Sequence, residues 1–134
     1  MKNPILHWAL RLIPAIILLQ TLFFKFSANE ESVYIFSTLG IEPWGRIFSG
    51  VVELIAAILI IIPSATALGA LTAAGVMSGA LLSHFFVLGI EVKGDGGLLF
   101  VLALVTLICS AILIWLNKSQ LVKLPLIGGW FERK

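Results

Sequence analysis

The chain has 134 residues, of which 60% are hydrophobic and only 12% are charged. A soluble domain of this length needs a polar surface, and so few charges cannot make one, so the composition excludes an ordinary soluble domain and predicts a protein embedded in lipid. The net charge of +2 is small and scattered, which argues against a nucleic-acid partner.

The first predicted element is a membrane span over residues 5–26, since a spanning helix needs about 20 mostly apolar residues. A cleaved signal peptide fits this segment poorly. Arg11 interrupts the apolar stretch, and Phe26 stands where a small residue should precede a cut after Ala28. We therefore expect the segment to be retained.

Residues 27–45 are mixed in composition and predict a short helix between the first two spans. Asn29 is a suitable N-cap, and two acids follow it in the first turn, Glu30 and Glu31. Apolar residues then recur at three-residue steps, as on a helix lying at the membrane surface: Val33, Phe36 and Leu39.

Three more spans are predicted, over residues 46–62, 65–90 and 97–116. Only Pro63 and Ser64 separate the second from the third, so these two helices must pack antiparallel. The third carries small residues at four-residue steps, a pattern that lets helix backbones approach closely in lipid: Gly75, Gly79 and Ser83.

The predicted fold is therefore all-α: a polytopic membrane protein forming an antiparallel four-helix bundle with a short interfacial helix, one domain over residues 1–134. Four spans place both termini on one side. That side carries Lys2, Lys118, Lys123, Arg133 and Lys134, and the other carries Lys25, Arg46 and Lys93. The positive-inside rule thus predicts a cell (inner) membrane protein with cytoplasmic termini.

Ionisable residues inside the spans are the candidates for function, because one near the bilayer centre costs about 2.5–3.5 kcal/mol on insertion scales. At 1.5 Å per residue, Glu53 lies about 10 Å below Arg46 at the outer end of its helix. His84 lies about 9 Å below Ile90 at the outer end of the next. The acid and the imidazole are therefore expected at similar depth on neighbouring helices.

Three further charges belong to this predicted outer cluster. Arg46 and Glu53 are seven residues apart and share a helix face, and Lys25 emerges on the same side of the membrane. We expect Glu53 and His84 at the bottom, Lys25 and Arg46 at the mouth, and Asp95 at the rim.

Each of these residues also has a purely structural interpretation. Glu53 is either a free acid in a cavity or the partner of Lys25 or Arg46 in an ion pair that fixes packing. His84 is either a ligand or proton-transfer group or a neutral ring bonded to a carbonyl or to Glu53. Lys25 and Arg46 can also extend to lipid headgroups.

Metal and thiol chemistry are not expected. One His and one Glu fall short of the three protein ligands of a typical catalytic zinc, so no metal site is predicted. Cys109 is the only cysteine, lies in an apolar helix, and is interpreted as a packed, inert thiol.

Several of these residues, taken in order, resemble the DoxX-like family of small four-helix membrane proteins over residues 5–116. The resemblance rests on Phe-Phe-Lys-Phe at 23–26, Gly40 and Pro43 in the loop, Gly50-x-x-Glu53-Leu54, and Ser83-His84. It implies that Lys25, Gly50, Glu53 and His84 are the polar positions of the family.

The resemblance leaves the activity open, because the family ranges from quinone-linked oxidoreductase subunits to maturation factors and cargo receptors or chaperones. One hypothesis is a redox-accessory protein that binds a quinone-like or other small amphipathic molecule, with a quinone from the membrane as the cofactor and a redox protein as partner. The others are a non-catalytic assembly factor or chaperone for a membrane or exported protein, and a small proton-coupled transporter, enlarged if the chain forms a homodimer.

Overall fold

The structure is a computed structural model that describes residues 4–92 and 94–122. Over these residues the ordered elements are all helices, in the order α1 Pro4–Phe26, α2 Glu30–Thr38, α3 Trp44–Ile61, α4 Thr66–Ser83, the π-helix η1 His84–Leu88, α5 Leu98–Leu116 and α6 Lys118–Val122. The predicted all-α class is confirmed.

Four of these helical segments are long and apolar enough to cross a membrane: α1, α3, α4 continued by η1, and α5. Their bounds lie within two residues of those expected from the sequence. Large apolar side chains remain exposed on the outside of the bundle, among them Phe23, Phe48, Phe86 and Ile108. Such a surface suits contact with lipid acyl chains rather than with water.

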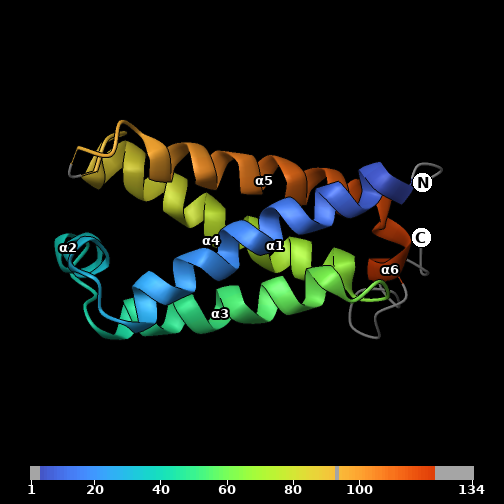
Figure 1. Ribbon diagram of the computed structural model, residues 1–134, viewed down its shortest axis with the longest axis horizontal. Coiled ribbons are helices and arrows are strands. Elements are labelled where there is room, and N and C mark those ends of the chain that lie inside the picture. Colours follow the sequence, from blue (N-terminus) through green and yellow to red (C-terminus); the bar gives the residue numbers. More distant parts are fainter. Residues whose placement is uncertain (1–3, 93, 123–134) are drawn as a thin grey trace.

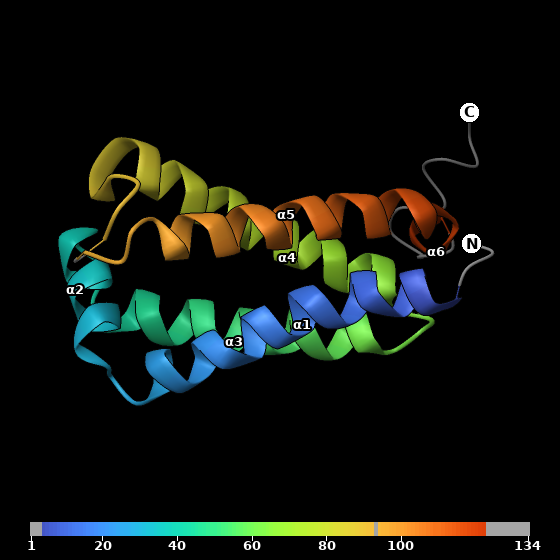
Figure 2. The ribbon, with the colours of Figure 1, turned by 45° about the horizontal axis from the view of Figure 1, so that its top comes forward.

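The four long helices form an antiparallel bundle in which each packs against two others. α1 packs against α3 and α5, and α4 packs against the same two helices, so α1 and α4 lie across a diagonal (Figures 1 and 2). Buried Leu18, Ala56, Ile60, Ala70 and Leu113 belong to one apolar core shared by all four.

The backbones of α3 and α4 approach closely at Gly69. A Cβ atom added to Gly69 would lie 2.6 Å from the amide nitrogen of Ile60 and 2.8 Å from the carbonyl oxygen of Ala56. No side chain fits in that space. The short turn after α3 brings these two backbones together, as the sequence predicts.

The predicted packing positions Gly75 and Gly79 do not make this contact. Both are exposed, and a Cβ atom added to either would meet no described atom within 4 Å. Ser83 donates its hydroxyl proton back to the carbonyl of Gly79 at 2.9 Å rather than to another helix. Among the described residues, Gly69 makes the small-residue contact with α3 instead, because the face of α4 that carries Gly69 is turned toward α3.

The two ends of the bundle differ. At one end α1 begins, α3 turns into α4, and α5 passes into α6 (Figure 1). There Gln120 of α6 accepts the Ala67 N–H at 2.9 Å and donates to the Pro63 carbonyl at 2.8 Å, which fixes α6 against the turn. At the opposite end lie α2 and η1 (Figure 2).

The short helix α2 forms where the sequence predicts it. The Asn29 side chain accepts the Glu31 N–H at 3.0 Å, so this residue is the N-cap. The buried side chains of α2 are Ser32 and Phe36, which face the bundle. That α2 lies at a membrane surface stays a prediction.

Candidate functional site

A cavity of about 530 Å³ lies in the end of the bundle that carries α2. All four spans, α2 and η1 contribute to its wall. Most of the lining is apolar and includes Leu18, Phe24, Ile35, Phe36, Val76, Met77 and Leu102. The ionisable side chains in the wall are Lys25, Glu31, Glu53, His84 and Asp95. A cavity of this size and composition is in the range of small-molecule binding sites.

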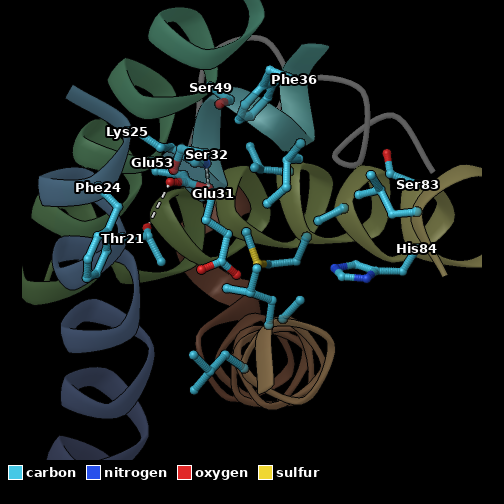
Figure 3. Close-up of a pocket in the computed structure, with 18 of the residues that line it drawn as sticks. Thr21, Phe24, Lys25, Glu31, Ser32, Phe36, Ser49, Glu53, Ser83 and His84 are labelled. Carbon is cyan, nitrogen blue, oxygen red and sulfur yellow. Dashed lines mark hydrogen bonds and ion pairs between the residues drawn. The ribbon is translucent and has the colours of Figure 1, made fainter. Parts of the chain in front are cut away.

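Glu53 of α3 and Lys25 of α1 form an ion pair at one side of the cavity (Figure 3). Lys25 Nζ lies 2.6 Å from Glu53 Oε1, and the side chains are 15% and 3% exposed. The Thr21 hydroxyl lies 3.2 Å from the other carboxylate oxygen, Oε2. The Glu53 carboxylate thus has partners on both oxygens, which is what a buried charge requires.

Gly50, three residues before Glu53, lets the end of α1 reach this position. A Cβ atom added to Gly50 would lie 2.8 Å from Cε1 of the Phe26 ring. Because glycine leaves room for that ring, α1 can approach α3 closely where Lys25 meets Glu53. The Gly50-x-x-Glu53 spacing thus has a packing explanation as well as a chemical one.

Arg46, predicted at the mouth of the cavity, is not among the residues that line its wall. Its Nε donates to Glu42 Oε1 at 2.8 Å, and Nη1 donates to the main-chain carbonyl of Lys25. Arg46 is only 7% exposed. The prediction placed Arg46 by its helix face alone. An acid one turn earlier and the carbonyl end of α1 hold the guanidinium away from Glu53.

His84 lies at the opposite side of the cavity from Glu53, and no hydrogen bond joins the two (Figure 3). Its Nδ1 is 2.9 Å from the Gly89 carbonyl oxygen, while the Gly89 N–H donates to the His84 carbonyl at 2.8 Å. The residue is 5% exposed, and its ring meets Phe100 edge to face. Of the interpretations left open for His84, hydrogen bonding to a nearby carbonyl is the one observed.

This hydrogen bond determines which nitrogen of a neutral imidazole carries the proton. A carbonyl oxygen only accepts, so Nδ1 must donate, and the neutral ring then offers the lone pair of Nε2. The same segment changes from α to π winding at His84, and Gly89 ends it with φ +81° and ψ 169°. π-Segments occur often at functional sites.

Asp95 lies in the cavity wall, but its carboxylate accepts hydrogen bonds from backbone N–H groups. Oδ1 accepts the N–H groups of Val92 at 3.0 Å and Gly97 at 2.8 Å, and Oδ2 accepts that of Leu99 at 3.2 Å. Burial alone would raise the pKa of Asp95, but these three donors and the electrostatic influence of His84 together outweigh it and lower the pKa. Asp95 thus organises the start of α5.

Glu31 is a cavity residue that the sequence did not reveal. Its position in the first turn of α2 predicts a stabilising surface acid, whereas in the structure its side chain reaches into the cavity (Figure 3). The cavity-facing residues of α2 and its C-cap are Glu31, Ser32, Ile35, Phe36 and Leu39. The helical spacing from Glu31 to Ile35 and Leu39 was the available signal. Of the residues at three-residue steps, Phe36 and Leu39 do line the cavity and Val33 does not.

The chemistry available in this wall is proton exchange and polar recognition. Within residues 4–92 and 94–122, no three His, Cys, Asp or Glu side chains come together as metal ligands. Cys109 is buried in α5 and does not line the cavity. The cavity thus offers an ammonium, carboxyl groups, a hydroxyl and an imidazole nitrogen in apolar surroundings.

The sequence profile of the DoxX-like family matches residues 9–112. This range includes all of the cavity-lining residues named above. No curated protein and no solved structure matches the chain.

Proposed function

The chain belongs to the DoxX-like family, and from that premise we propose that it binds a small amphipathic molecule in the cavity beside α2. Four helices long and apolar enough to span a bilayer make it an integral membrane protein. A molecule dissolved in the lipid can therefore reach the bundle without crossing water.

One observation carries this proposal: a largely apolar cavity of about 530 Å³ has its ionisable groups gathered at a few places on the wall. Apolar walls bind a hydrocarbon body, and a few placed polar groups orient a head. The Lys25–Glu53 pair with Thr21 forms one such place, and His84 forms another.

A quinone-like molecule is the redox version of this proposal. Lys25 can donate a hydrogen bond to a quinone oxygen, and Glu53 and His84 can exchange protons with a quinol. Within the described part of the chain no side chain is an electron carrier, since the lone thiol of Cys109 is buried away from the cavity. The protein would then act as an accessory that presents the quinone to a redox partner.

Two exposed glycines of α4 allow a sharp test of ligand binding. Gly79 lines the cavity and Gly75 does not, and a side chain added at either meets no atom within 4 Å. We expect Gly79→Phe to abolish binding of a decyl-substituted quinone to the purified protein in phosphatidylcholine nanodiscs, and Gly75→Phe to leave it unchanged. Equal binding by both variants and the unmodified protein would remove this function.

The exposed glycine face of α4 also supports a second candidate, an assembly factor that docks a partner membrane helix. Small residues let two helix backbones approach in lipid, and a Cβ added at Gly75 or Gly79 meets no atom within 4 Å, although Gly79 also lines the cavity. Here Gly75→Leu and Gly79→Leu should both reduce co-purification of a partner from native membranes. Loss with Gly79→Leu alone would point back to the cavity.

We propose that the protein lies in the cell (inner) membrane with the α6 end in the cytoplasm. The side of the termini carries five positive residues and the other side carries three. A reporter active only in the cytoplasm, fused after Lys134, should be active. A reporter active only outside, fused at the same place, should be silent.

A further inference from the structure

We propose that the molecule bound in this cavity is a cation, an amphipathic amine whose ammonium group pairs with Glu31. The inference rests on the proposed function, because it assumes that the cavity beside α2 holds a ligand. It adds the sign of the ligand's charge and the residue that recognises it.

The first observation is the position of Glu31. The residue is half-buried, and its side chain leaves the α2 backbone and extends into the cavity (Figure 3). Of the residues that the structure describes, none donates a hydrogen bond to its carboxylate or forms an ion pair with it. Its backbone N–H is occupied by the Asn29 cap, but the acid itself has no partner within residues 4–92 and 94–122.

The second observation is how the other charges of the wall are used. The Lys25 ammonium is 2.6 Å from Glu53 and so is already neutralised. The Asp95 carboxylate accepts three backbone N–H groups. His84 directs Nδ1 to a carbonyl. Glu31 therefore remains as the charge in the wall that has no partner among the described residues.

A carboxylate in an apolar cavity is unfavourable until something compensates it. The N-terminal end of α2 favours acids in its first turn, yet no N–H of that helix bonds to the Glu31 carboxylate. A neutral head could donate a hydrogen bond but would leave the negative charge uncompensated, and an anionic head would add repulsion. A protonated amine satisfies it with a charge-assisted hydrogen bond.

Aromatic side chains in the same cavity wall favour the same ligand. Phe24 and Phe36 both line the cavity, and ring faces attract cations. Lys25 Nζ lies 5.5 Å from the centre of the Phe36 ring, so this ring already takes part in a cation–π contact.

The test compares two probes of equal chain length, decylamine and decanol, that differ in head charge. They are titrated calorimetrically into protein in phosphatidylcholine nanodiscs, with empty nanodiscs subtracted. We expect decylamine to bind about tenfold more tightly than decanol. Glu31→Gln should remove that preference. Glu30→Gln, the same change at the neighbouring exposed position outside the cavity wall, should keep it.

Charge reversal gives a second variant, and thermal unfolding in the nanodiscs shows that each variant is folded. Glu31→Lys should bind decanoate more tightly than decylamine. If both probes bind the unmodified protein equally and Gly79→Phe blocks both, the cation inference is overturned while the cavity function stands. If neither probe binds, both are overturned.

Discussion

At the scale of single residues, the Lys25–Glu53 pair joins α1 to α3 inside the apolar part of the bundle. Glu53 is the more deeply buried partner, at 3% exposure against 15% for Lys25. Removing one partner of a buried pair leaves the other charge uncompensated, and the cost rises with the burial of the group that remains. Removing Lys25 and removing Glu53 should therefore destabilise the protein by different amounts.

We predict that Lys25→Met destabilises the protein more than Glu53→Gln, by about 3 kcal/mol for the lysine change. The double variant should be more stable than the sum of the two single effects implies, because it leaves no unpaired charge. Thermal unfolding in mild detergent measures all four states of the cycle. Strictly additive effects would show that the pair contributes nothing.

Asp95 gives a prediction that depends on pH. Its folded-state pKa lies below the ordinary value of 3.8, so its contribution to stability is complete above about pH 3.8 and is lost as the pH falls through the lower folded value. Asp95→Asn replaces one of the two accepting oxygens by an NH2 group and removes the charge, so it should cost about 1 kcal/mol at neutral pH. The stability difference between Asp95→Asn and the unmodified protein should shrink as the pH is lowered below 3.8. A constant difference across that range would contradict this account.

Sequence reasoning recovered part of this site and missed another part for identifiable reasons. Helix depth predicted that Glu53, His84 and Lys25 belong to one region, and all three line the cavity. Depth gives no side-chain direction, so it could not show that Arg46 turns to Glu42 or that Glu31 turns inward. The interposed cavity also explains why Glu53 and His84 share a wall without touching.

At the scale of elements, the change from α4 to η1 decides where His84 points. The sequence predicts one helix through Ile90, because Phe85, Phe86 and Val87 continue the apolar run without interruption. Hydropathy reports burial in lipid and cannot report a change of hydrogen-bond register. Only Gly89 signals the end of the segment, and its backbone angles, φ +81° and ψ 169°, lie in a region that is essentially restricted to glycine.

We predict that Gly89→Ala destabilises the protein by about 1–3 kcal/mol, because alanine cannot adopt these angles without strain. Gly75→Ala is the matched control. Gly75 lies in a regular helix with open space around its Cα, so alanine there should be neutral or stabilising by up to about 1 kcal/mol. Thermal unfolding in mild detergent compares the two, and equal shifts would mean that η1 tolerates the substitution.

At the scale of the whole molecule, hydropathy and the two-residue turn were sufficient to predict four spans and the α3–α4 hairpin. They could not predict which helices lie diagonally, because that follows from how side chains of four helices fit together. They also did not identify Gly69 as the close contact. Its small size is informative only once the backbones of Ile60 and Ala56 are seen beside it.

We predict that Gly69→Ala disrupts the bundle while Gly79→Ala does not. The added methyl group at residue 69 must displace the α3 backbone, at a cost of about 1–3 kcal/mol. At residue 79 it enters open space. The yield of monodisperse protein in detergent and its unfolding temperature both report the difference. A normal unfolding temperature for Gly69→Ala would show that α3 and α4 can separate at no cost.

The ion pair between α1 and α3 also has a consequence for biosynthesis. Its members are 28 residues apart, and the lysine comes first. A ribosome therefore delivers Lys25 to the insertion machinery before Glu53. When Glu53 enters the hydrocarbon, the Lys25 ammonium has already been delivered. The nascent chain therefore avoids a stage in which the Glu53 carboxylate lies in the membrane without a counter-ion.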